Sequence, residues 1–304
     1  MEQAEVAEVP ERSLWRRIAE YPLVAMLIAI ALVILGIVIS GFIAALLQKL
    51  VLPPSYGLKL ETLVEIIAIP VLVIIYKLAI RHLGEHPRDD FKDPKAVQHL
   101  LLGLAAGLLI FSIAVGVAAL MGIYTVKGEG DLTGLFTALI GAAIFPAVNE
   151  EMLFRGILFR WIEEFGGSWM ALLVTCALFG GAHHLNPHAS GIAAIGIAFE
   201  AGIMLGDAYM LTRSLWLPMG LHAAWNFAQG EIYDIPVSGT PVHGIIDARL
   251  CCDPLLTGNG FGLEASPIAI AVATLFGLWL LWLAIRKDQL VQPRWVRRRL
   301  SDSA

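Results

Sequence analysis

Phe145 to Gly156 reads FPAVNEEMLFRG, and it places two carboxylates and a guanidinium inside an apolar segment that begins near Leu132. An ionisable group at membrane depth costs roughly 2.5–3.5 kcal/mol on insertion scales, so such groups usually face a protein interior or a watery cavity. On a helix, Glu151 and Arg155 are four positions apart and can pair. Glu150 projects about 100° away from Glu151, toward a different neighbour. The stretch therefore predicts an internal site in which one carboxylate is held by a cation and the other is free to take a proton.

The composition of the whole chain indicates a membrane protein. Its 304 residues are 58% hydrophobic and 15% charged, with a mean hydropathy of +0.74, whereas about 25% of the residues of a soluble globular protein are charged. The apolar residues form long runs, which is typical of a polytopic helical membrane protein. The net charge of −5 gives no support for nucleic-acid binding, and three cysteines do not make a disulfide framework.

Eight apolar runs predict an all-α bundle of about eight transmembrane helices. They are approximately Tyr21–Leu47, Leu60–Leu83, Val97–Tyr124, Leu132–Trp161, Trp169–Leu185, Gly191–Leu211, Leu215–Gln229 and Pro267–Ile285. An even number of crossings places both termini on one side. Lys and Arg are concentrated on that side, for example from Arg81 to Lys95 and from Arg294 to Arg299, which predicts that both termini are cytoplasmic. We expect the protein in the plasma membrane of a prokaryote.

The runs also divide the chain into five parts. They are a cytoplasmic N-terminal segment (1–20), three N-terminal transmembrane helices (21–130), a catalytic core with helices four to seven (131–230), an extramembrane loop (231–262), and the last transmembrane helix with a basic cytoplasmic tail (263–304).

Two further polar clusters lie in apolar runs. FGGAHH places Phe179 and His183 four residues apart, and LHAAWN does the same for His222 and Asn226. Residues at this spacing share one helical face, one turn apart. A lone buried histidine is more often a hydrogen-bonded structural residue than a catalyst. Glu, His, His and Asn on three separate apolar helices, however, are the set that an intramembrane hydrolytic site requires.

These four side chains match the needs of peptide hydrolysis, which are an activated water, a proton for the leaving amine and donors for the oxyanion. Glu150 can serve as the general base. His183 can hold the water and pass protons. His222 and Asn226 can supply N–H donors to the oxyanion. Arg155 is expected to be a structural partner of Glu151 rather than a catalyst.

The competing chemistry is a zinc site with His183, His222 and Glu150 as ligands, because three N/O ligands and a water make an acceptable catalytic zinc set. The chain lacks HExxH, the commonest local zinc-protease signature, and Asn226 would be a poor zinc ligand. We therefore favour a mechanism without a cofactor and keep zinc as the alternative.

The three motifs together resemble a known family. EExxxR (Glu150, Glu151, Arg155), FxxxH (Phe179, His183) and HxxxN (His222, Asn226) follow one another on successive hydrophobic segments. In this order they are similar to the CPBP family of CAAX proteases and bacteriocin-processing enzymes, also called Abi, which includes the type II CAAX prenyl endopeptidases. The motif-bearing region spans about Leu132 to Gln229.

The resemblance implies an eight-helix bundle with intramembrane endopeptidase activity. Carried over to this chain, Glu150 and His183 activate water, and His222 with Asn226 stabilises the oxyanion. Glu151, Arg155 and Phe179 are the remaining motif positions and are expected to support the site. The expected partners are a membrane-associated peptide or protein substrate and the lipid bilayer.

Two other functions compete with proteolysis. A non-catalytic immunity or scaffold protein of the same fold is one, although a scaffold has no need of Glu150 with His183. A transporter is the other, in which buried carboxylates such as Glu200 and Asp207 relay protons. Proton-coupled uptake in liposomes would favour the transporter.

Overall fold

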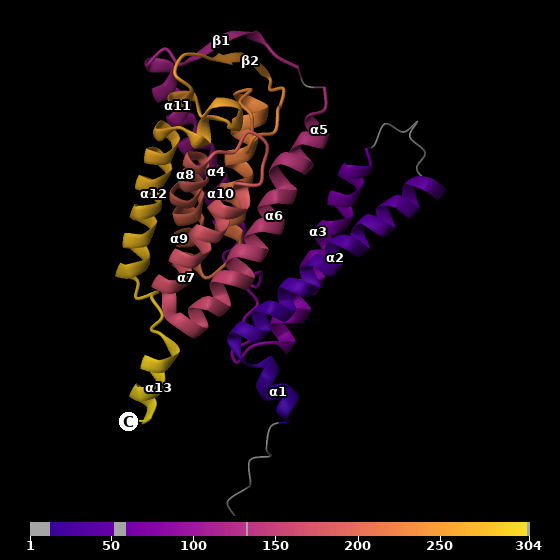
Figure 1. Cartoon of the computed structure of the whole chain (residues 1–304), viewed down its shortest axis with the longest axis vertical. Helices are drawn as coiled ribbons and strands as arrows, with labels where there is room; N and C mark the ends of the chain where they lie inside the picture. Colours follow the sequence, from indigo (N-terminus) through magenta and orange to yellow (C-terminus); the bar gives the residue numbers. More distant parts are fainter. Residues whose placement is uncertain (1–12, 52–58, 132, 303–304) are drawn as a thin grey trace, which may run out of the picture.

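A computed structural model describes residues 13–51, 59–131 and 133–302. Part of the predicted N-terminal segment, residues 1–12, therefore lies outside the described residues. The described chain is a mostly helical bundle with one two-stranded sheet (Figure 1). Six of its helical segments are long and apolar enough to cross a membrane: Pro22–Leu50, Leu60–His82, Ala96–Leu120, Leu135–His183, Gly191–Thr212 and Pro267–Arg286. The protein is thus an integral, multi-pass membrane protein.

The difference between six segments and the predicted eight crossings has two sources. The predicted fourth and fifth spans are joined in one helical stretch of 49 residues, which reverses direction at Gly167, where φ is 82° and ψ is 171°. The predicted seventh span is helical but shorter than the six long segments. The count of eight and the cytoplasmic orientation of the termini stay predictions.

The first half of the described chain contains nine elements. They are α1 (Leu14–Ala19), α2 (Pro22–Leu50), α3 (Leu60–His82), α4 (Ala96–Leu120), β1 (Tyr124–Glu129), α5 (Leu135–Ala138), the π-helix η2 (Leu139–Ile144), α6 (Phe145–Glu151) and the π-helix η3 (Met152–Phe159).

The second half contains twelve elements among the described residues. They are α7 (Arg160–His183), α8 (Gly191–Ile197), the π-helix η4 (Ala198–Gly202), α9 (Ile203–Thr212), α10 (Trp216–Phe227), the π-helix η5 (Ala228–Ile232), β2 (Ile246–Leu250), α11 (Pro254–Thr257), the 3-10 helices η6 (Asn259–Phe261) and η7 (Leu263–Ala265), α12 (Pro267–Arg286) and α13 (Arg294–Asp302).

The small sheet departs from the all-α prediction. β1 pairs with β2 in antiparallel fashion, with Tyr124 opposite Leu250. The third apolar run predicts a helix as far as Tyr124, but that helix ends at Leu120, and Gly122 (φ 73°) turns the chain into β1. Partners more than a hundred residues apart leave no local pattern that predicts such a pairing.

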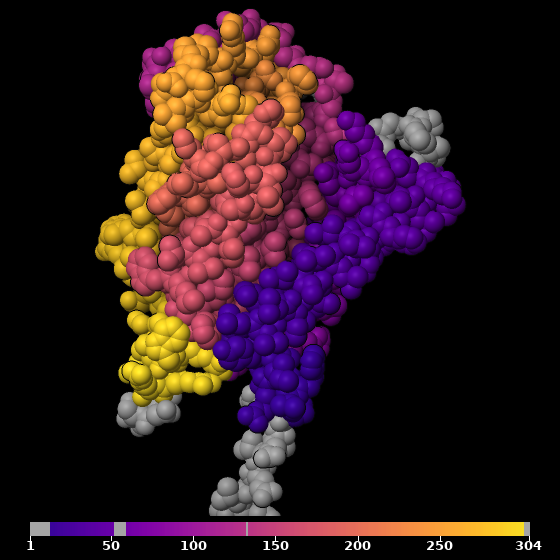
Figure 2. Space-filling model, in the orientation of Figure 1, coloured from indigo at the N-terminus to yellow at the C-terminus, as the bar shows by residue number. Residues whose placement is uncertain are grey.

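The two ends of the bundle differ. α1 and α13 lie at one end, and β1 and β2 lie at the other (Figure 1). At the α1 end, Asp90 accepts hydrogen bonds from Arg160 (2.9 Å) and from the hydroxyl of Tyr76 (2.7 Å). At the β1 end, the chain between η5 and α12, orange in Figure 2, covers the bundle.

Close packing of α4 against α10 positions half of the candidate site. A Cβ added at Gly103 would lie 2.4 Å from the carbonyl oxygen of Leu217, and one at Gly107 would lie 2.3 Å from that of Leu221. Glycine is therefore required for the two backbones to approach this closely, as in many helix pairs of membrane proteins. The contact fixes α10, which carries His222 and Asn226.

Candidate active site

Glu150 lies on α6, a short α-helix between two π-helical segments. Pi-helical turns inside α-helices are frequent at functional sites. Pro146 has no N–H, so it cannot donate to the carbonyl of Ala142 four residues earlier. The side-chain amide of Asn226 donates to that carbonyl instead, with an N–O distance of 2.9 Å. Because Pro146 leaves the carbonyl of Ala142 without a helical N–H donor, this carbonyl is available to Asn226, and the hydrogen bond joins α10 to the segment before Glu150.

His183 faces Glu150 from the end of α7. Its Nδ1 lies 2.9 Å from the carbonyl oxygen of Phe179. Because a carbonyl only accepts hydrogen bonds, Nδ1 carries the proton and Nε2 of the neutral ring keeps its lone pair. Nε2 lies 4.0 Å from Oε2 of Glu150, which is too long for a hydrogen bond and suits a bridging water. Oε2 of Glu150 has no hydrogen-bond partner among the described residues.

His222 is held by the second carboxylate of the EExxxR motif. Its Nδ1 donates to Oε1 of Glu151 at 2.9 Å, and the same oxygen accepts from Arg155 at 3.0 Å. With Nδ1 donating, Nε2 carries a proton only in the imidazolium form, whose charge Glu151 would compensate. The guanidinium of Arg155 also stacks on Phe179, 4.7 Å from the ring centroid. Glu151, Arg155 and Phe179 are buried and form the support behind the two histidines.

One cavity brings the four predicted catalytic residues together. It has a volume of about 620 Å³, and Glu150, His183, His222 and Asn226 all contribute to its wall. Most of the remaining wall comes from the start of α3, from α5 and η2, and from the segment 237–243, and Asn186 and Glu231 also contribute. These segments lie toward the β1 end of the bundle (Figure 1). Residues that share no local motif in the sequence are thus neighbours in space.

The loop after α10 builds part of the cavity wall, a role that no motif in the sequence predicts. Val237 and Thr240 pair across a tight turn. The N–H of Ser238 within that turn donates to Oε1 of Glu264 at 2.5 Å. Burial raises the pKa of Glu264 to about 7, against the smaller opposite effects of the Ser238 hydrogen bond and of His222. The only sequence signal for Glu264 is a lone carboxylate directly before the apolar run of α12.

Two further carboxylates lie deep in the bundle. Glu200 is buried and lines a small second cavity, of about 20 Å³, together with His222, Asn226 and Glu264. Asp207 is buried, and neither of its carboxylate oxygens has a hydrogen-bond partner among the described residues. Glu200 is therefore adjacent to the candidate site, while Asp207 lies outside both cavity walls.

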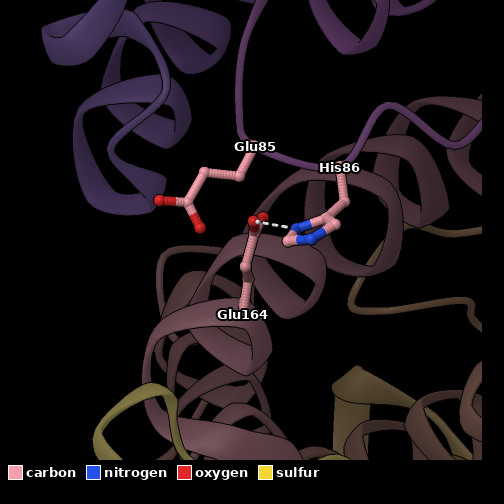
Figure 3. A group of neighbouring side chains, drawn as sticks. All are labelled: Glu85, His86 and Glu164. Atoms are coloured by element: carbon pink, nitrogen blue, oxygen red, sulfur yellow. Dashed lines mark hydrogen bonds and ion pairs between the residues drawn. The ribbon is translucent and has the colours of Figure 1, made fainter. Parts of the chain in front are cut away.

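The zinc alternative depends on how closely the ligand atoms converge. In the described part of the chain, one trio has ligand atoms that all lie within 4.8 Å of one another, namely Glu85, His86 and Glu164 (Figure 3). In it, Nδ1 of His86 lies 3.0 Å from Glu164, and Glu85 also pairs with Arg294. The predicted ligands Glu150, His183 and His222 do not reach this separation.

Comparison with known proteins agrees with the motif region. Residues 132–228 match the family model described as Type II CAAX prenyl endopeptidase Rce1-like. The match covers roughly a third of the chain and includes all seven motif residues. A search of curated proteins and a search of solved structures gave no match. The resemblance inferred from the three motifs is thereby confirmed.

Proposed function

We propose that this protein, whose residues 132–228 match the Rce1-like family of CAAX proteases, is an intramembrane endopeptidase that hydrolyses a peptide bond in a membrane-associated substrate. One observation carries the proposal. Four polar side chains from α6, α7 and α10 line a single cavity of the membrane-protein bundle. A carboxylate, a histidine with a free Nε2 and two further N–H donor side chains are the functional groups that hydrolysis needs.

The geometry supports a division of labour between Glu150 and His183. A water between Oε2 of Glu150 and Nε2 of His183 gives a proton to the carboxylate while its oxygen adds to the substrate carbonyl. The C–N bond then breaks, and Glu150 returns the proton to the leaving amine. The His183 ring holds the water in line, because its Nδ1 is fixed by the carbonyl of Phe179.

The charge on the substrate oxygen is stabilised from α10. Asn226 uses one N–H on Ala142 and has a second for the oxyanion. His222 adds a donor at Nε2 in its imidazolium form, with Glu151 as the counter-charge. Removing one oxyanion donor typically lowers kcat by about 10²–10³.

The zinc version of this mechanism would use Glu150, His183 and His222 as ligands. Their donor set fits a divalent metal. Bound zinc would supply Lewis-acid activation of the water. In this version Asn226 alone would remain on α10 for the oxyanion. Their ligand atoms do not all lie within 4.8 Å of one another, which supports the version without metal.

The test compares purified wild type with Glu150→Gln on a quenched membrane-peptide substrate, with and without a strong chelator. Glu164→Gln is the control, because it removes a carboxylate at the opposite end of the bundle and also breaks the trio in Figure 3. We expect Glu150→Gln to abolish cleavage, and we expect the control and the chelator to leave it intact. Loss under the chelator that zinc restores in both wild type and Glu164→Gln would establish the metal version. Cleavage that persists in Glu150→Gln would refute the proposed role of Glu150.

A further inference from the structure

The wall of the active-site cavity carries an excess of acidic side chains. Glu150 is accompanied there by Glu61 and Glu65 of α3 and by Glu231 of η5. Lys59 is the single Lys or Arg among the described residues of the wall. Glu61 is exposed, Glu65 is half-buried and Glu231 is buried, so the carboxylates extend from the mouth of the cavity to its interior.

These carboxylates differ from the acids of the protein that pair with an arginine. Glu151 pairs with Arg155, and Glu163 pairs with Arg213. Glu61, Glu65 and Glu231, in contrast, have no side-chain ion pair among the described residues. The three carboxylates of the cavity wall are therefore available to a positive charge that comes from outside.

Glu65 lies directly beside the catalytic segment. Its carboxylate is so close to Gly141 that a Cβ there would be only 3.0 Å from one of its oxygens. Gly141 belongs to η2, which leads into the helix that carries Glu150. Glu61 is four residues before Glu65 and therefore on the same face of α3. Both carboxylates therefore share the cavity wall with Glu150.

Acidic side chains in a cavity with low-dielectric walls concentrate a negative potential, which attracts cations and repels anions. We infer that the cavity takes a peptide segment with Lys or Arg next to the cleaved bond and cuts it internally. A free C-terminal carboxylate close to the bond would face unpaired carboxylates instead. This inference rests on the proposed endopeptidase function and names its substrate class.

The first test uses three peptides of equal length that differ only in two residues flanking the cleaved bond, which are Lys, Gln or Glu. We expect kcat/KM to fall in that order, by about tenfold or more between Lys and Glu at low salt. The ratio should shrink at high salt, because ions screen the cavity charges. An equal or higher kcat/KM for the Glu peptide would overturn the inference.

Variants identify which charges are responsible. Glu61→Gln combined with Glu65→Gln should lower the Lys-to-Glu ratio of kcat/KM by about threefold or more, because two of the four wall carboxylates are removed while Glu150 and Glu231 remain. Glu85→Gln, at the opposite end of the bundle, should leave the ratio as in wild type. An unchanged ratio in the double variant would overturn the assignment to α3. Each measurement includes Glu150→Gln as the inactive control. Cleavage that depends on Glu150 but shows no charge preference would contradict this inference. Absence of any cleavage that depends on Glu150 would contradict the proposed function.

A second pair of peptides tests the carboxyl terminus. One ends in a free carboxylate three residues after the cleaved bond, and the other ends there in an amide. We expect faster cleavage of the amide. Faster cleavage of the free acid would show that the cavity accepts a terminal carboxylate despite its acidic wall, and would overturn the inference.

Discussion

One oxygen of Glu151 accepts hydrogen bonds from both Arg155 and His222. The spacing of four predicts the pair with Arg155, because both residues lie on one helix. The bond to His222 joins positions 71 residues apart, and no feature of either motif specifies it. Glu151 is therefore both a counter-charge of the fold and the group that orients a candidate catalytic ring.

Arg155→Leu should strongly destabilise the protein. It leaves the buried Glu151 without its cation, a change that costs about 3–5 kcal/mol in buried pairs. Arg16→Leu is the matched control, because Arg16 pairs with Glu20 at the same spacing but is 70% exposed, and exposed pairs contribute at most about 1 kcal/mol. Thermal unfolding in detergent compares the two. Equal destabilisation would show that burial of the Arg155 pair is unimportant.

Pro146→Ala should lower activity without loss of stability. It restores an N–H that competes with Asn226 for the carbonyl of Ala142, and we expect kcat/KM to fall about tenfold or more as the Asn226 amide turns away. Pro70→Ala is the control, because Pro70 also lies inside a helix but not in the cavity wall. Full activity in Pro146→Ala would mean that the Asn226 to Ala142 bond does not position the oxyanion donors.

Among the helices, α4 positions the site by packing against α10, which carries His222 and Asn226. Gly107 meets the carbonyl of Leu221, the residue before His222. Gly107→Ala should push α10 outward, and a misplacement of about 1 Å at a catalytic group can cost about 10² in rate. Gly116→Ala, in the same helix and with nothing within 4 Å of an added Cβ, should be neutral. The measurement is kcat/KM for both variants, and equal values would remove this helix contact from the mechanism.

The loop that ends at η7 should make stability depend on pH through Glu264. Its pKa in the folded protein is about 7, above the ordinary 4.5, so the folded state binds more protons than the unfolded state between these values. The free energy of unfolding is then highest below about pH 4.5 and falls as pH rises to about 7, by about 3 kcal/mol from this group.

Unfolding temperatures at pH 5 and pH 7.5 test this effect. Glu264→Gln should lose a large part of the difference, because glutamine keeps an oxygen acceptor for Ser238 and has no charge to bury. A variant with the same pH dependence as wild type would show that Glu264 is ionised at little cost.

The helices of this protein are predicted by local patterns in the sequence, whereas its strand pair and loop contacts are not. Long apolar runs and a few polar residues within them predict the helices and the four candidate catalytic residues. The contribution of Ser238 to the cavity wall and its hydrogen bond to Glu264 were not predicted, because loop residues follow no period and acquire their neighbours only from tertiary packing. The strand pair β1–β2 was missed for the same reason.

On the scale of the whole molecule, the cavity opens at the end opposite α1 and α13. If the termini are cytoplasmic, as the distribution of Lys and Arg predicts, substrates enter from the other side of the membrane. Cys252 can show on which side of the membrane this end lies, because it is an exposed free thiol that follows β2.

A membrane-impermeant maleimide should therefore label Cys252 in intact cells. Cys252→Ser should lose most of the label, because Cys176 is buried and Cys251 is only partly exposed. Labelling that requires permeabilised cells would reverse the predicted orientation and place the mouth of the cavity in the cytoplasm.

The turn at Gly167 has a consequence for biosynthesis. The arm that carries Glu150 and the arm that carries His183 follow each other with a single non-helical residue between them. We expect such a helical hairpin to insert into the lipid as one unit. The two groups proposed to activate water would then enter the membrane together, and α10, which follows the hairpin in the chain, would add His222 and Asn226.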